Sequence, residues 1–104
     1  MDMAKKYLFL YSGGNPPKSE AEGKAVMDAW MAWFGKVGPK VVDGGAPFAP
    51  GAKTVGGASP SHASGYSIIT ADSLGDAVAL TDGHPHIASG GGIEVFEIAP
   101  MPGM

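Results

Sequence analysis

The sequence predicts an α+β fold, in which one antiparallel sheet packs against two helices. Two observations indicate it. Short apolar segments with the periodicity of strands occur near both ends of the chain and in its middle, and two further segments repeat apolar residues at helical spacing. The length of 104 residues is that of one domain, so we assign residues 1–104 to a single domain. The 17 glycines and 9 prolines predict long, sharply turned connections between its elements.

Charge and cysteine content exclude several classes of function. Seven basic residues against ten acidic ones give a net charge of -3, and no basic run is longer than Lys5-Lys6, so a nucleic-acid-binding face is not expected. The absence of cysteine excludes disulfides and thiolate catalysis and agrees with a reducing compartment. The apolar segment 7–11 is shorter than the core of a signal peptide, and nothing approaches the ~20 apolar residues of a membrane span. We therefore expect a cytoplasmic protein that binds neither nucleic acid nor membrane.

The first part of the chain predicts a strand followed by an amphipathic helix. Residues 5–12, KKYLFLYS, are aromatic-rich and precede two glycines, which is typical of a buried strand. Ser19 and Glu22 fit a capping box and predict that a helix begins there. Its apolar stripe, which we expect to face the core, comprises Val26, Trp30, Trp33 and Val37, widened by Met27, Met31 and Phe34. Gly38-Pro39 predicts its end, because proline cannot continue a helix.

The rest of the chain predicts two strands, a second helix and a final strand. The strands are residues 40–45 and 64–71, and segment 46–63 between them is a long loop or an irregular hairpin, with room for a short strand around AKTV. Ser73 and Asp76 repeat the capping pattern, and Gly83 stands where a helix-ending glycine is expected. The apolar side of this second helix is Leu74, Ala77, Val78 and Thr81. Residues 93–98 predict the last strand, followed by a proline-rich tail at 99–104.

The order strand, helix, strand, strand, helix, strand is that of a ferredoxin-like βαββαβ subunit with an antiparallel sheet. Right-handed crossovers place both helices on one face of such a sheet and leave the other face bare. The strands carry apolar side chains on both faces, as in Tyr7, Phe9 and Tyr11 against Leu8 and Leu10. A second copy of the chain is the simplest cover, so we predict a homodimer with its sheets face to face. The pattern leaves open which of the two sets looks into the dimer.

Three segments resemble the YCII-related, or DGPF-domain, family of dimeric α+β barrel proteins. They are WMAWFGKVGPKVVDGGAPF at 30–48, GYSIITADSLGDAVAL at 65–80 and GGGIEVFEI at 90–98. The resemblance implies a dimeric α+β barrel that encloses a cleft, with a proposed histidine–aspartate pair. One relative acts as a dehydrochlorinase on a hydroxylated aromatic ring. In this chain Trp30 or Trp33 stands at the matching helix positions, and His84 replaces the aspartate before the proline.

The candidate catalytic residues are His84 and Asp43. His84 follows Gly83, so its ring is expected near the carboxyl end of the second helix, where the helix dipole favours the protonated form. Asp43 ends the second predicted strand, where its carboxylate could orient a histidine or a substrate hydroxyl. The alternatives stay open: His84-Pro85 as a simple turn whose ring caps a carbonyl, and Asp43 as an Asp-Gly turn residue that bonds its own backbone.

Four further residues are candidates for substrate binding: Tyr11, Trp30, Trp33 and His86. The aromatic ones would line a pocket for an aromatic molecule, and their alternative is ordinary core packing. His84 and His86 form a His-x-His that His62 or Asp43 could complete as a metal site, but such spacing alone is weak, and we predict no metal and no cofactor. Two hypotheses follow: a homodimer that binds a small organic, aromatic or apolar molecule and performs cofactor-free acid–base chemistry, or a non-catalytic ligand-sensing or dimerisation module.

Overall fold

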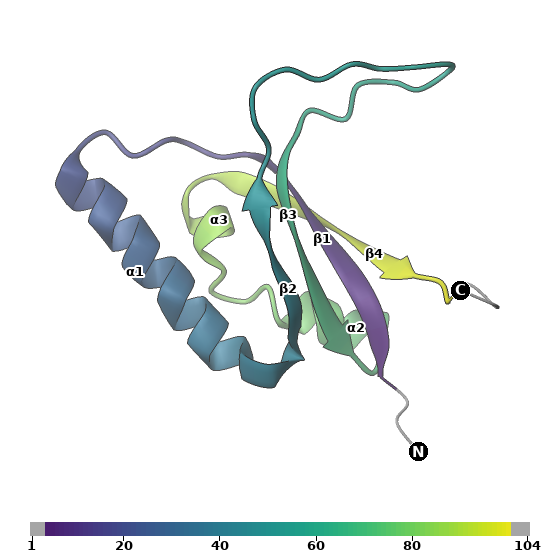
Figure 1. Ribbon diagram of the computed structural model, residues 1–104. Helices are drawn as coiled ribbons and strands as arrows, with labels where there is room; N and C mark the ends of the chain where they lie inside the picture. Colours follow the sequence, from purple (N-terminus) through teal and green to yellow (C-terminus); the bar gives the residue numbers. More distant parts are fainter. Residues whose placement is uncertain (1–3, 101–104) are drawn as a thin grey trace.

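The protein is an α+β domain built on one open, four-stranded antiparallel sheet, which is compatible with a ferredoxin-like fold (Figure 1). The computed structural model describes residues 4–100. Along the described chain the elements are β1 (Lys5–Gly13), α1 (Glu20–Val37), the 3-10 turn η1 (Gly38–Lys40), β2 (Val41–Pro47), β3 (Ala63–Ala71), α2 (Leu74–Ala79), α3 (Pro85–Ala88) and β4 (Gly91–Ile98). The strand order is β2-β3-β1-β4, so β1 and β3 are central.

Both predicted capping motifs begin a helix. The Ser19 hydroxyl accepts from the Glu22 amide at 3.0 Å and starts α1, and the Ser73 hydroxyl accepts from the Asp76 amide at 3.1 Å and starts α2. Gly38 ends α1 with φ 59°, a left-handed value that favours glycine. The second helix is shorter than predicted: α2 ends at Ala79, and Gly83 belongs to the turn that follows.

The core lies between the helices and the face of the sheet that carries Tyr7, Phe9 and Tyr11. Tyr7 pairs with Ile69 on β3, and this alternation puts the odd-numbered side chains of both strands on the same face. The other core members come from the helices and the end of β3: Trp33, Val37, Ala77 and Ala71. The sequence pattern did not decide which side chains of β1 meet the helices. In the structure they are Tyr7, Phe9 and Tyr11, because Leu8 and Leu10 point away from the helices.

The opposite face of the sheet is apolar and bare within the single chain. Leu8 pairs with Ile68 on β3 and with Phe96 on β4, which places the three side chains side by side. Phe96 is 42% exposed and Ile98 37%. The predicted bare face is therefore present, and whether a second copy covers it stays a prediction.

Two parts of the predicted core differ in the structure. Met27 and Met31 are 64% and 69% exposed, because they lie on the side of α1 that overlooks a cleft instead of the sheet. On α2 only Ala77 is buried, while Leu74 and Val78 remain about half exposed.

The long connection between β2 and β3 projects beyond the end of the sheet (Figure 1). Its residues 48–62 contain no strand, so the short strand allowed around AKTV is not formed. It is anchored at its base, where the Phe48 amide donates to the Ser64 carbonyl at 2.8 Å and the Phe48 ring stacks on Tyr66. Of the predicted tail 99–104, residues 101–104 lie outside the described part of the chain.

None of the helices formed within residues 4–100 combines the length and the apolar content that a membrane crossing requires.

Candidate functional site

An aromatic cleft of about 810 Å³ opens between α1 and the ends of β1, β2 and β3. One wall is the exposed side of α1, with Met27, Trp30, Met31 and Phe34. Tyr11 and Tyr66 contribute from the sheet, and His86 from α3. Of the predicted substrate-binding residues, Tyr11, Trp30 and His86 line this cleft.

Trp33 lies behind the cleft. Its ring is buried in the core, and its indole N–H donates to the Leu80 carbonyl at 2.9 Å. The indole therefore ties α1 to the segment after α2 and supports the wall that Trp30 presents, with the two rings 6.2 Å apart.

His84 is enclosed beneath the cleft and is only 1% exposed. Aromatic rings surround it, with centroids 4.3 Å away for Trp33, 4.9 Å for Trp30 and 5.2 Å for Tyr11. His84 does not cap a carbonyl of α2. It precedes α3 as its N-cap, where Nδ1 accepts a hydrogen bond from the His86 amide at 3.0 Å, and Pro85 is the first helical residue.

A directed chain of hydrogen bonds leaves the buried His84 ring. Because Nδ1 accepts from an amide, the proton of the neutral ring is on Nε2, which donates to the Tyr11 hydroxyl at 3.1 Å. Tyr11 donates in turn to Ser67 Oγ at 2.7 Å, and Ser67 donates to the Gly44 carbonyl at 2.9 Å. Every polar side-chain atom of this hydrogen-bond network has a partner, so the network fixes both the tautomer of His84 and the position of Tyr11.

Burial sets the charge states of the two titratable residues in this network, His84 and Tyr11. Desolvation, with a smaller contribution from His86, lowers the pKa of His84 from 6.5 to about 4, so the ring is neutral at pH 7. Desolvation raises the pKa of Tyr11 to about 12, partly opposed by its bond to Ser67, so the hydroxyl stays protonated. The protonated state expected for a histidine at a helix carboxyl end is thus replaced by a neutral one.

Asp43 lies on exposed β2 and does not contact His84. Its Oδ1 accepts from the Gly45 amide at 2.8 Å, as in an Asp-Gly turn, and its Oδ2 accepts from the Tyr66 hydroxyl at 3.2 Å. Gly44, which accepts the last bond of the buried chain, is inside that turn. Asp43 therefore reaches the His84 chain only through the backbone it holds.

His86 stands at the rim of the cleft with its ring held at one nitrogen. Nε2 lies 2.9 Å from the Ser12 carbonyl, and the ring packs 5.1 Å from Tyr11. No three His, Asp or Glu side chains among residues 4–100 are grouped so that they could hold one metal ion. In particular, His62 is an exposed residue of the long connection, where the sequence had allowed it as a third ligand.

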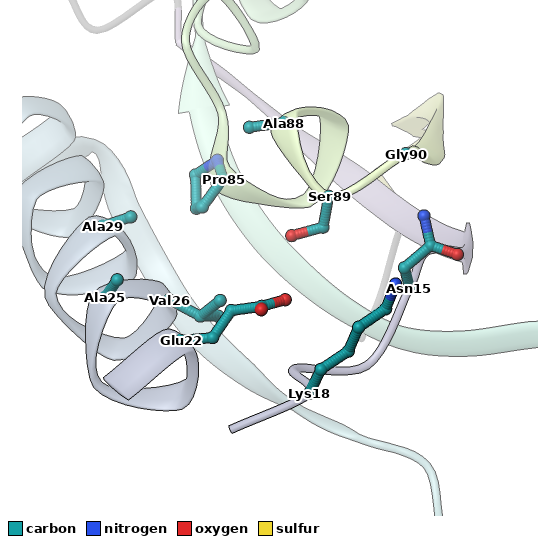
Figure 2. Close-up of a pocket in the computed structure, with 10 residues that line it drawn as sticks. All are labelled: Asn15, Lys18, Glu22, Ala25, Val26, Ala29, Pro85, Ala88, Ser89 and Gly90. Carbon is teal, nitrogen blue, oxygen red and sulfur yellow. The ribbon is translucent and has the colours of Figure 1, made fainter. Parts of the chain in front are cut away.

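A second hollow, of about 620 Å³, lies beside the aromatic cleft between the first turns of α1 and α3 (Figure 2). The Glu22 carboxylate and the Ser89 hydroxyl point into it, and Ala25 and Ala29 form its wall on α1. Asn15, Val26 and Ser89 line both cavities, so the two adjoin there.

Comparison with known proteins identifies no relative: no family model matches the chain, and no curated protein or solved structure matches it either. The YCII-related resemblance stays a prediction.

Two features of the site were missed by sequence reasoning. The helix α3 has only four residues, and its one signal was a proline directly after a residue able to accept an amide hydrogen bond. Ser67 lies within the predicted strand 64–71 and was not a candidate site residue. Its hydrogen bond to Tyr11 depends on the pairing of β1 with β3, where Ser67 is the partner of Phe9, and no local sequence motif predicts that pairing.

Proposed function

We propose that the protein binds a small, flat, largely apolar molecule in the aromatic cleft. The observation that carries this proposal is the composition of the cleft: aromatic and methionine side chains form its walls, and a few polar groups converge at one end. Its volume of about 810 Å³ is in the range of small-molecule sites. The absence of cysteine supports a cytoplasmic setting for this activity.

Cofactor-free acid–base chemistry is the catalytic form of this proposal. In it, Tyr11 is the residue that meets the ligand and His84 is the buried group behind it, because Tyr11 lines the cleft and the His84 Nε2–H donates to its hydroxyl at 3.1 Å. Asp43 contributes as an orienting group, since it holds the turn whose Gly44 carbonyl ends the chain.

The alternative is a non-catalytic ligand-sensing module. One observation favours it: no buried side-chain nitrogen or oxygen in the described part of the chain lacks a hydrogen-bond partner. The side chains of His84, Tyr11 and Ser67 already satisfy one another's hydrogen-bonding groups, as in a buried polar network that stabilises a core. Turnover of a bound compound, lost in Tyr11→Phe, would distinguish the enzyme from the sensor.

We further propose that the working unit is a homodimer, a dimeric α+β barrel formed by two ferredoxin-like subunits. The support is the bare sheet face with Leu8, Ile68 and Phe96 at its centre, since monomeric proteins rarely leave such a patch in water. A two-fold interface uses the same patch twice, so no other partner is required.

The two tryptophans provide a matched test of binding, because Trp30 lines the cleft and Trp33 lies behind it. A panel of non-fluorescent aromatic compounds is titrated against Trp30→Phe and Trp33→Phe while tryptophan emission is recorded. We expect a ligand to quench or shift the emission of Trp33→Phe, which retains Trp30, and to change that of Trp30→Phe much less. A panel that leaves wild-type emission and thermal stability unchanged would contradict the proposal.

A further inference from the structure

We infer that His86 is the hydrogen-bond acceptor that orients the ligand in the aromatic cleft, and that the cleft therefore selects uncharged aromatic molecules with an N–H or O–H donor on the ring edge. This inference rests on the proposed function, because it names the ligand class of the same cleft. It assigns to His86 a role separate from that of the buried His84.

The hydrogen-bond partner of His86 fixes its tautomer. Its Nε2 lies 2.9 Å from the Ser12 carbonyl oxygen. A carbonyl only accepts hydrogen bonds, so Nε2 must carry the proton and donate it. The lone pair of the neutral ring is therefore on Nδ1.

The lone pair on Nδ1 of His86 has no hydrogen-bond partner in the described part of the chain. Within residues 4–100 no hydrogen bond to this atom is formed, yet no buried side-chain nitrogen there is unpaired, so Nδ1 must reach solvent. The cavity that His86 lines is the aromatic cleft. Nδ1 of His84 is not available in this way, because it already accepts a hydrogen bond from the His86 amide.

The His86 ring is held between two glycines. A Cβ at Gly14 would come within 3.0 Å of His86 Cε1, and a Cβ at Gly91 would collide with the ring outright. These two glycines form a slot for the imidazole, and Tyr11 packs against it. An acceptor held in this way is preorganised, so it orients a ligand at a small entropic cost.

The lining of the cleft also favours one charge state of the ligand. The residues lining the cleft include no Asp, Glu, Lys or Arg. An ionised ligand would lose hydration there without gaining an opposite charge, so a neutral molecule is favoured. A flat, neutral ring packed against the aromatic wall of the cleft, with a donor directed at Nδ1, satisfies both requirements.

The test compares indole with benzofuran, which has nearly the same shape but carries oxygen where indole carries N–H. Affinities are measured by calorimetry for wild type, His86→Phe and His62→Phe, the last being a control in the exposed connection. We expect the preference for indole over benzofuran to fall by up to about tenfold in His86→Phe and to stay unchanged in His62→Phe, as for the loss of one hydrogen bond.

The outcomes separate this inference from the proposed function. If both compounds bind and His86→Phe keeps the wild-type preference, the role of His86 is wrong while the cleft remains a binding site. If neither compound nor any other aromatic probe binds to wild type, both proposals fail. Should His86→Phe not fold, imidazole nitrogen NMR of the wild type decides: indole must shift the Nδ1 resonance of His86 and benzofuran must not, and equal shifts overturn the inference.

Discussion

The two histidines of the turn show how environment separates residues of one type. His84 and His86 are two positions apart in the sequence, and both rings carry their proton on Nε2. Burial makes His84 part of the core, with both nitrogens bonded inside the protein, whereas His86 keeps one nitrogen open. The difference arises because the N-cap position turns His84 inward and uses its Nδ1 for a backbone amide.

The neutral, buried state of His84 predicts that stability falls in mild acid. The pKa of His84 is about 4 in the folded protein against 6.5 in the unfolded chain, so between these values the unfolded state binds more protons. The stabilisation is complete above about pH 6.5 and is lost as the pH falls toward 4. For this one group we expect about 2 kcal/mol less free energy of unfolding at pH 5 than at pH 7.5.

Urea unfolding at the two pH values measures this effect. The control is His84→Asn, which retains an N-cap acceptor but has no titrating ring. The variant should be less stable at pH 7.5, yet its stability should depend less on pH than that of the wild type. An equally steep pH dependence in the variant would show that other groups cause it.

At the residue scale, the sequence predicted the identity of the site residues better than their roles. Tyr11, Trp30 and His86 line the cleft, and they were nominated from the aromatic residues of the first predicted strand and helix and from the His-x-His of the turn. The partners of His84 could not be predicted in the same way, because Tyr11 is 73 positions away and meets it only after the sheet and α1 have packed.

At the element scale, local signals worked where one motif dictates one structure. The serine caps of α1 and α2 and the glycine that ends α1 are of this kind. Packing decided the remainder: the apolar stripe of α1 is wider than its contact with the sheet, so Met27 and Met31 became cleft residues. Helix α3 is too short for periodicity to reveal.

The start of β4 offers a matched pair of substitutions that tests the slot around His86. A methyl group at Gly91 collides with the His86 ring, whereas one at Gly92 meets only the Ser12 hydroxyl at 3.8 Å. We expect Gly91→Ala to lower the free energy of unfolding by about 1–3 kcal/mol, as overpacking does. Gly92→Ala should be neutral or slightly stabilising, because alanine reduces the entropy of the unfolded chain.

Chemical denaturation of the two variants provides the measurement. Gly91→Ala should also lose the preference for indole if it displaces the imidazole. Equal stabilities for the two variants would mean that the His86 ring moves at little cost, and that it is not held as the geometry indicates.

At the scale of the whole molecule, the uncovered face of the sheet is the reason to expect that two copies of the chain associate. Strand order and register place apolar side chains on both faces, and the helices cover one face and leave the other open. Alternation along β1 and β4 was sufficient to predict that this face exists. It was not sufficient to predict which side chains occupy it, since that depends on where the helices dock.

The proposed homodimer can be tested at the centre of this face. Leu8→Lys places a charge between Ile68 and Phe96, where a face-to-face partner would have to bury it. Val55→Lys is the matched control, because Val55 is 82% exposed in the projecting connection and away from the sheet. By sedimentation equilibrium we expect wild type and Val55→Lys at twice the 10.5 kDa chain mass, and Leu8→Lys at the monomer mass with its circular dichroism unchanged. A wild-type monomer at micromolar concentration would contradict the dimer, and a dimeric Leu8→Lys would show that the chains associate through another surface.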